Sequence, residues 1–382
     1  MIRVITIIGA RPQIIKAAAL SRVFREKYQG KVEEILVHTG QHYDENMSEV
    51  FIDELDLPIP QYNLNVGSGT HGQQTSAMIT GIEEILLREK PHCILLYGDT
   101  NSTLAGAVAA SKIHVPVVHI EAGLRSFNKK MPEELNRIIA DHTSTLLFSP
   151  TKTGIRNLVR EGFRKKTSPP YSDDNPCIFH SGDVMYDNTI FFSGRAEKRS
   201  TILKEKNLEA GKFILCTIHR DSNTDNPERL KTLFGAILKI AADFGTQFAI
   251  PLHPRTSKLL VNNLPPEMYN RLSTDPRIRL LKPASFFDMI MLEKNCSMIW
   301  TDSGGVQKEA YFHKKPCLIL RSETEWVELV KAGVAVLTDA DEKKILKAYR
   351  KMAKLKKAKF PPLFGDGKAA EYIANQIFRN FN

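Results

Sequence analysis

One stretch of the sequence decides its fold: Ser297-Met298-Ile299-Trp300-Thr301-Asp302-Ser303-Gly304-Gly305-Val306-Gln307-Lys308-Glu309. An apolar run, then small polar residues with two glycines, then a helix-forming run predicts a strand, a turn and a helix. Free backbone N–H groups and the helix dipole favour an anion at such a junction. We interpret it as a phosphate-binding turn, in which Ser303 adds a donor and Glu309 accepts bonds from sugar hydroxyls. An ordinary capped turn would have the same pattern, so this interpretation depends on groups elsewhere in the chain.

The same alternation of apolar, β-branched runs and amphipathic segments extends along the whole chain. Short apolar runs separated by helices are typical of parallel sheets that are covered on both faces. The predicted strands of the first half are Val4–Ile8, Glu34–His38, Cys93–Tyr97, Val115–Ile120 and Thr145–Phe148. Those of the second half are Phe213–Thr217, Gln247–Ile250, Arg277–Leu280, Ser297–Trp300, Cys317–Leu320 and Ala335–Leu337. The sequence therefore predicts an α/β fold of two doubly wound, Rossmann-like domains, with a ligand cleft at the carboxyl ends of their sheets.

Length and composition support a division into two domains. The chain has 382 residues, of which 42% are hydrophobic, and this is enough for two cores of ordinary size. The segment Asp183–Arg199 is predicted to be a helical crossover, and the amphipathic segment Lys368–Phe381 is expected to pack back on the first domain. The predicted domains are residues 1–183 with 368–382, and residues 184–367.

The charge balance narrows the class of ligand. Lys and Arg number 53 against 43 Asp and Glu, and the net charge of +10 suits a phosphorylated ligand or a nucleic acid. The lysine-rich run Lys343–Lys359 lacks the interleaved aromatic residues of a single-strand binder and favours a solvated helix face. The five cysteines show no metal-ligand spacing, and no apolar run approaches the roughly 20 residues of a membrane helix. We expect a cytoplasmic enzyme without a metal or cofactor that binds neither nucleic acid nor membrane.

Charged side chains follow the predicted strands of the first half. Arg11 and Lys16 flank the turn after the first strand, which lacks the glycine patterns of nicotinamide and ATP sites. Asp99 follows the strand that begins at Cys93, and it could either cap the next helix or act in a site. Glu121 ends the neighbouring strand, so the two carboxylates are expected at the same edge of one sheet. Glu133 and the glutamate after it begin a helix, where a structural role is expected for one of the two.

The second half offers histidines at the ends of two strands. His219 follows Thr217, with Arg220 beside it, and His253 follows the strand that begins at Gln247. One such histidine is usually structural, whereas two of them on the sheet that carries the Ser303 turn favour a site. The first half thus supplies carboxylates for proton transfer, and the second half supplies a site for a nucleotide diphosphate.

Eight ordered motifs carry a resemblance to a known family. The motifs are GARPQIIK, TGQH, YGDTNST, HIEAGLRS, PEELNR, TIHR, PLHP and TDSGGVQKEA, spread from residue 9 to residue 310. This set resembles the non-hydrolysing UDP-N-acetylglucosamine 2-epimerases. The resemblance implies the two-lobed fold of nucleotide-sugar glycosyltransferases (GT-B type), a homodimer, and a UDP-sugar substrate. It also implies a reaction in which UDP leaves by anti elimination, giving 2-acetamidoglucal, and then adds back.

The same resemblance implies roles for individual residues. Its acid–base and catalytic positions match Asp99, Glu121, Glu133 and His219 in this sequence. The UDP-binding set that fits the resemblance and the strand-end pattern is Arg11, Lys16, His253, Ser303, Gly304, Gly305 and Glu309. Which carboxylate removes the C2 proton stays open at this point.

Departures from the family pattern concern the substrate. Trp326 stands where many members have an arginine. Residues 43–47 differ from the sequence that is associated with binding of a second, activating sugar nucleotide. After His219 the chain has Arg220-Asp221-Ser222-Asn223 in place of the commoner arginine-x-glutamate-asparagine. Similar departures are found in relatives that act on UDP-2,3-diacetamido-2,3-dideoxyglucuronate. We therefore expect a UDP-N-acetylglucosamine 2-epimerase without allosteric activation, with the diacetamido-uronate enzyme as the alternative. A glycosyltransferase and a basic nucleic-acid-binding protein are the more distant alternatives.

Overall fold

The computed structural model describes residues 1–41, 54–355 and 359–382. The chain forms two compact units: unit 1 comprises Met1–Asn188 and Pro362–Asn382, and unit 2 comprises Thr189–Pro361. The predicted boundaries lie after residues 183 and 367. Residues 42–53 and 356–358 lie outside the described residues; they include part of the motif TGQH, the departures at residues 43–47 and part of the lysine-rich run.

Unit 1 is built on a seven-stranded parallel sheet with the order β3-β2-β1-β4-β5-β6-β7. The strands are β1 (Ile2–Ile8), β2 (Val32–His38), β3 (Tyr62–Asn63), β4 (Cys93–Tyr97), β5 (Val117–Ile120), β6 (Leu146–Ser149) and β7 (Cys177–His180). The chain runs from β1 to β3 in one direction and from β4 to β7 in the other, so the strand order reverses between β1 and β4. Ligands bind at such reversals, beyond the carboxyl ends of the strands.

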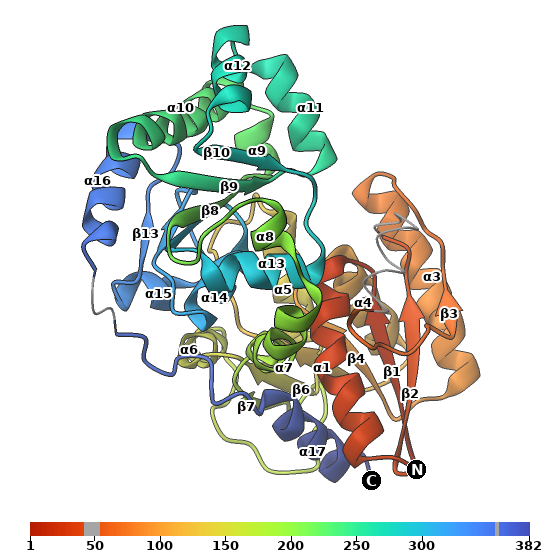
Figure 1. Cartoon of the computed structure of the whole chain (residues 1–382). Helices are drawn as coiled ribbons and strands as arrows, with labels where there is room; N and C mark the ends of the chain where they lie inside the picture. Colours follow the sequence, from red (N-terminus) through yellow and green to blue (C-terminus); the bar gives the residue numbers. More distant parts are fainter. Residues whose placement is uncertain (42–53, 356–358) are drawn as a thin grey trace. The chain divides into compact units, whose positions relative to one another are not determined.

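Helices cover both faces of this sheet (Figure 1). They are α1 (Arg11–Lys27), α3 (His71–Glu89), α4 (Asn101–Lys112), α5 (Pro132–His142), α6 (Lys152–Arg160) and α17 (Ala369–Phe381). The helix α7 (Val184–Arg199) begins in unit 1 and continues into unit 2. On one face Ile5 and Ile7 of β1 join a core with α3, α4 and α5. On the other face α17, dark blue in Figure 1, packs on α1, where Tyr28 and Phe378 place their rings 5.4 Å apart. The C-terminal helix thereby becomes part of unit 1.

Unit 2 repeats the architecture with six parallel strands in the order β10-β9-β8-β11-β12-β13. The strands are β8 (Phe213–Thr217), β9 (Gln247–Pro251), β10 (Ile278–Leu281), β11 (Met298–Thr301), β12 (Cys317–Ile319) and β13 (Ala335–Leu337). The helices are α8 (Ile202–Glu205), α9 (Asp221–Thr224), α10 (Pro227–Phe244), α11 (Pro254–Asn263), α12 (Pro266–Thr274), α13 (Phe286–Asn295), α14 (Gly304–Phe312), α15 (Val327–Lys331) and α16 (Glu342–Ala353). Here the order reverses between β8 and β11, which are the counterparts of β1 and β4.

The predicted α/β class with two doubly wound sheets is confirmed. Every predicted strand is present, with its ends shifted by two residues or fewer. Two edge strands were not predicted: β3, which has two residues, and β7, which has four and follows a polar segment. None of the helices in the described ranges is long and apolar enough to cross a bilayer.

Candidate active site

Asp99 lies in the loop after β4 and is held by Arg137 of α5. The Arg137 Nη2 and Nε atoms lie 2.6 Å and 2.9 Å from Asp99 Oδ2. The adjacent Asn136 donates a hydrogen bond of 2.9 Å to the backbone oxygen of Asp99. The cap of the next helix is Thr100, whose hydroxyl accepts from the Thr103 N–H, so the capping role weighed for Asp99 belongs to its neighbour. The Asp99 side chain keeps 30% of its surface exposed and is available to a ligand.

Glu121 follows β5 and forms an ion pair with Lys16 of α1. The Lys16 Nζ and Glu121 Oε1 atoms are 2.6 Å apart, and both side chains are about nine-tenths buried. Glu121 has a φ of +79°, an unfavourable backbone conformation for a residue with a side chain. Gly98, which lies between β4 and Asp99, has a φ of +64°. A Cβ at this position would lie 2.9 Å from Lys16 Nζ and 3.6 Å from Glu121 Oε1. The ammonium group therefore closes over a glycine that is adjacent to Asp99.

The two glutamates at the start of α5 have different surroundings. Glu134 is buried, and its carboxylate accepts from the N–H groups of Ser126 and Phe127, both at 2.9 Å, and from Arg137 at 2.6 Å. Burial alone would raise the pKa of Glu134, but these donors outweigh it and lower the pKa. Glu133 is half-buried and has no hydrogen-bond or ion-pair partner among the described residues. The structural role expected for one glutamate of the pair thus falls to Glu134.

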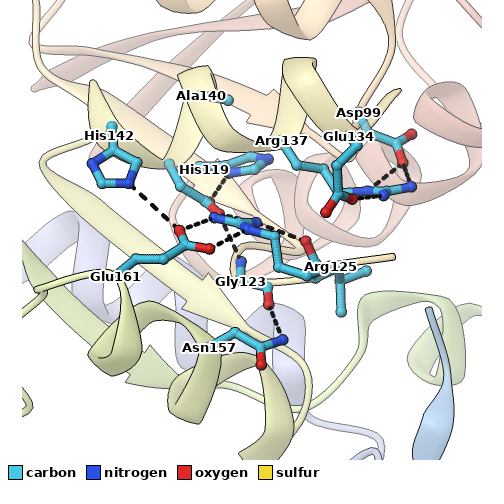
Figure 2. A network of polar contacts seen from close by, with 12 residues as sticks. Asp99, His119, Gly123, Arg125, Glu134, Arg137, Ala140, His142, Asn157 and Glu161 are labelled. Atoms are coloured by element: carbon cyan, nitrogen blue, oxygen red, sulfur yellow. Dashed lines mark hydrogen bonds and ion pairs between the residues drawn. The ribbon is translucent and has the colours of Figure 1, made fainter. Parts of the chain in front are cut away.

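A buried chain of charges lies beneath these loops (Figure 2). His119 of β5 and Asp141 of α5 are both fully buried, with His119 Nδ1 2.7 Å from Asp141 Oδ1. Asp141 Oδ2 lies 2.7 Å from Arg125 Nη1, and the Arg125 guanidinium forms two further bonds to Glu161. Burial would raise the pKa of Asp141, but His119 and Arg125 lower it below its ordinary value. Sequence reasoning did not single out these residues, although His119 and Arg125 lie inside one of the quoted motifs.

The loop after β1 packs against the loops after β2 and β4. A Cβ on Gly9 would lie 2.1 Å from Thr39 Oγ1 and 2.3 Å from Ser102 Oγ, so only glycine allows this approach. The two hydroxyl groups bond each other at 2.8 Å. Arg11, the first residue of α1, stays partly exposed next to this packed region.

In unit 2 the reversal point between β8 and β11 is organised by Asp302. This aspartate is fully buried, and its carboxylate accepts from the backbone N–H groups of His219 and Arg220 at 3.1 to 3.2 Å. The Asn223 amide adds a bond of 3.0 Å. The His219 ring contacts the same carboxylate at 3.2 Å, yet 48% of its side chain remains exposed. Asp302 therefore fixes the loop, and His219 presents a polar ring from it.

The predicted phosphate turn is the N-terminus of α14. Ser303 is the N-cap, with its hydroxyl accepting from the Val306 N–H at 3.4 Å, and Gly304 and Gly305 are the first two helical residues. A Cβ on Gly304 would meet Glu325 Oε2 at 3.6 Å. Glu309, in the second turn of the helix, is half-buried. The first backbone N–H groups of this helix point along its axis toward the space an anion would occupy.

Trp326, which stands where many family members have an arginine, lies close to α14 together with a buried ion pair. Arg321 and Glu325 form a buried pair with two bonds of 3.1 and 3.0 Å. Trp326 is buried, and its ring lies 4.5 Å from Lys308 Nζ. Arg321 is thus paired with Glu325, and Trp326 packs inside unit 2.

His253 occupies a different place from His219. It is the exposed N-cap of α11, and its Nδ1 accepts from the Arg255 N–H at 3.4 Å. The structure thus brings together Asp99, Glu121 and Lys16 in unit 1. In unit 2 it places His219 and the Ser303 turn at the ends of the adjacent strands β8 and β11.

Comparison with known proteins identifies the family. The family model described as UDP-N-acetylglucosamine 2-epimerase matches residues 26–378. The chain belongs to the UDP-N-acetylglucosamine 2-epimerase family. The resemblance carried by the eight motifs is thereby confirmed, and the family consists of isomerases.

Relatives of this epimerase family align over nearly the whole chain. A UDP-N-acetylglucosamine 2-epimerase of Methanocaldococcus jannaschii is 41% identical over 96% of both chains. A UDP-2,3-diacetamido-2,3-dideoxy-D-glucuronate 2-epimerase of Pseudomonas aeruginosa is 44% identical over 98% of this chain and 99% of the relative. Both candidate substrates thus occur among similar members of the family.

Solved structures of the family have the same fold. The crystal structure of the M. jannaschii UDP-GlcNAc 2-epimerase in complex with UDP-GlcNAc and UDP superposes with a TM-score of 0.88 at 39% identity, covering 99% of this chain and all of the other. A UGT transferase from Siraitia grosvenorii, solved in complex with UDP, is 11% identical with a TM-score of 0.59 over the full length of both chains and shares the fold alone. The chain therefore has the GT-B-like architecture that the resemblance implied.

Proposed function

We propose that this chain is a UDP-N-acetylglucosamine 2-epimerase, which interconverts the gluco and manno forms of the UDP-sugar. The observation that carries the proposal is the pair of carboxylates in unit 1: Asp99 and Glu121 follow adjacent strands, and each contacts one cation. The M. jannaschii relative, a UDP-N-acetylglucosamine 2-epimerase, supports this substrate.

The proposed reaction moves one proton and one leaving group. A carboxylate takes the C2 proton, the electrons of the C–H bond form the C1=C2 double bond, and UDP leaves with the electrons of the C1–O bond. UDP then adds back to C1, and a proton is delivered to the opposite face of C2, so no atom is gained or lost. Two faces of one carbon require proton-transfer groups at two positions, and Asp99, Glu121 and Glu133 are the groups we assign to this task.

The C2 proton is weakly acidic, so its removal needs preorganised charge. Lys16 and Arg137 hold the carboxylates Glu121 and Asp99 at fixed positions, which avoids reorganisation during the reaction. The half-buried Glu133 adds a carboxylate without a cationic partner among the described residues.

Departing UDP carries developing negative charge, which needs cations and N–H donors. For this task we assign Arg11, Lys16, His219, His253, Ser303, Gly304 and Gly305, with Glu309 as acceptor for the ribose hydroxyls. In this proposal unit 1 carries the proton-transfer groups and unit 2 carries most of the UDP-binding groups. We expect the enzyme to act as a homodimer in the cytoplasm.

The second candidate substrate is UDP-2,3-diacetamido-2,3-dideoxy-D-glucuronate, turned over by the same mechanism. It is favoured by the P. aeruginosa relative, whose identity of 44% is as high as that of the UDP-N-acetylglucosamine 2-epimerase homolog of Methanococcus maripaludis. The buried Trp326, which replaces the arginine of the usual pattern, is the second observation in its favour.

Proton NMR in deuterium oxide tests both candidates. The enzyme is incubated with each UDP-sugar in parallel, and deuterium at C2 is followed together with the appearance of the epimer. We expect deuterium at C2 and a manno product from UDP-N-acetylglucosamine. Exchange in the uronate alone would keep the reaction and change the substrate, whereas exchange in neither would overturn the proposal in favour of a glycosyltransferase.

A further inference from the structure

The buried His119–Asp141 pair (Figure 2) contacts the segments of unit 1 that follow β4 and β5. His119 Nε2 lies 2.8 Å from the backbone oxygen of Gly98, the residue before Asp99. Asp141 Oδ2 accepts from the Gly123 N–H at 3.1 Å, two residues after Glu121. Asp141 itself belongs to α5, the helix that begins near Glu133. Two side chains thus tie together the backbone segments next to all three proposed proton-transfer groups.

The His119 ring is held at both of its nitrogens. One nitrogen faces the Asp141 carboxylate and the other faces the backbone carbonyl of Gly98. The second oxygen of Asp141 is shared by Arg125, whose guanidinium also pairs with Glu161, so the contacts continue from His119 to Glu161.

The segments held by this pair have conformations that need external support. Gly98, Glu121 and Gly123 have φ values of +64°, +79° and +79°. Only glycine adopts such values without strain, and strained backbone persists only where surrounding contacts hold it. A Cβ on Gly123 would lie 2.5 Å from the backbone oxygen of Gly154, so this loop is also closely packed.

Burying an ion pair gives little net stability, since the desolvation penalty offsets much of the Coulomb attraction. Such a pair contributes more by holding the surrounding backbone in one conformation. We propose that His119 and Asp141 are positioning residues of the epimerase: they keep the Gly98 turn, the Glu121 loop and α5 in one arrangement, and with it the distance between Asp99 and Glu121. This inference rests on the proposed function, because it concerns the site of proton transfer.

Misplacement of the carboxylates and loss of folded enzyme should have different effects on the products. When the carboxylates are misplaced, removal of the C2 proton slows, and so does its return to the unsaturated sugar. A displacement of about 1 Å can lower a rate by about 100-fold. The intermediate then has time to escape, so free UDP and 2-acetamidoglucal accumulate relative to the epimer. A lower fraction of folded enzyme would reduce all products equally.

The test compares His119→Gln and Asp141→Asn with Ser144→Ala in the full-length protein. Ser144 is buried next to the C-terminal end of α5, and its hydroxyl bonds the backbone oxygen of Ala140 at 2.6 Å without reaching either loop. For UDP-N-acetylglucosamine, or for the uronate if the wild type uses that sugar, we expect kcat to fall about 10- to 100-fold in the first two variants. KM should change by less than about threefold, and the ratio of released UDP to epimer should rise about fivefold or more. Ser144→Ala should match the wild type in both ratio and kcat.

Unchanged ratios in folded His119→Gln and Asp141→Asn enzymes would overturn the inference while leaving the proposed function intact. If neither variant folds, Glu161→Gln decides, since Glu161 is partly exposed at the outer end of the same chain of charges. There the ratio should rise about twofold, and an unchanged ratio would again overturn the inference. Wild-type enzyme that places no deuterium at C2 of either sugar would instead overturn the proposed function, which distinguishes the two failures.

Discussion

Asp99 and Asp302 follow topologically equivalent strands, β4 and β11, at the reversal points of the two sheets. Their surroundings differ in every respect. Asp302 is fully buried, accepts from two backbone N–H groups and an amide, and contacts the His219 ring. Asp99 is 30% exposed, and among the described residues its carboxylate contacts Arg137 alone.

The difference separates an aspartate that builds a loop from one that can act. Buried carboxylates with every lone pair occupied fix backbone geometry, and their oxygens are unavailable to a substrate. A carboxylate held from one side by a guanidinium has a defined position and a free face. The same comparison applies to Glu134 and Glu133, where the buried residue binds backbone N–H groups and the half-exposed one does not.

The largest expected effect is on the buried side of this comparison. Asp302→Ala leaves two backbone N–H groups without this acceptor and removes one of the two bonds that the Asn223 amide donates, the other being to the Leu320 oxygen. Each unsatisfied buried group costs about 1 to 3 kcal/mol, so we expect a loss of about 3 kcal/mol or more in the free energy of unfolding of unit 2. Urea denaturation followed by fluorescence of the two tryptophans, Trp300 and Trp326, both in unit 2, measures it.

Asp302→Asn is the matched control, because an amide oxygen still accepts from one or two of these donors. It should be less destabilised than the alanine variant. A urea midpoint for Asp302→Ala equal to that of the wild type would break the comparison, since it would show that the loop does not need its carboxylate.

On the exposed side, Asp99→Asn should lower turnover by about 100-fold or more, the scale for loss of a positioned proton-transfer group. The free energy of unfolding should change by less than about 1 kcal/mol, because Glu134 remains to pair with Arg137. Asp56→Asn is the control: Asp56 is an exposed aspartate of unit 1 that pairs with Arg25 at 3.0 Å. Equal turnover of the Asp99 and Asp56 variants would remove Asp99 from the mechanism.

Much of this fold could be predicted because parallel strands leave a local pattern. Buried on both faces, they read as apolar runs such as Cys-Ile-Leu-Leu-Tyr at β4, whose bounds were predicted without error. Positions after strand ends follow from the same pattern, which is why Asp99, Glu121 and His219 could be named from sequence. The strand β7 was missed although it is no shorter than β6; it follows a polar segment, and its pairing with β6 defines it.

The partners of these residues could not be predicted, because they come from distant parts of the chain. Arg137 is 38 positions from Asp99, and Lys16 is 105 positions from Glu121. Local sequence also could not distinguish Asp99 from Asp302, since both stand between an apolar strand and a helix start. Only burial and the number of donors around each carboxylate show which one builds the loop.

His219 sharpens the comparison inside unit 2, because its ring shares a loop with Asp302 but remains half exposed. We expect His219→Ala to lower turnover by about 100-fold, the scale for removing one donor to developing negative charge. Stability should fall by less than about 1 kcal/mol, since Asp302 keeps its backbone donors and a half-exposed ion pair contributes little. Measurements of kcat and of the urea midpoint decide this: a large midpoint shift with unchanged kcat would make His219 a structural residue like Asp302.

The smallest expected effect concerns Gly98, which allows Lys16 to reach Glu121. Gly98→Ala adds a Cβ at φ +64° and 2.9 Å from Lys16 Nζ, so it both strains the turn and displaces the ammonium group. Gly30→Ala adds the same strain at φ +74° with nothing within 4 Å of the new atom. Both variants should lose about 1 kcal/mol of stability, but only Gly98→Ala should lose turnover, by about tenfold. If the two variants have equal turnover, contact between Lys16 and Glu121 does not matter for the reaction. A loss confined to Gly98→Ala would show that the contact between Lys16 and Glu121 is needed to make this carboxylate competent for proton transfer.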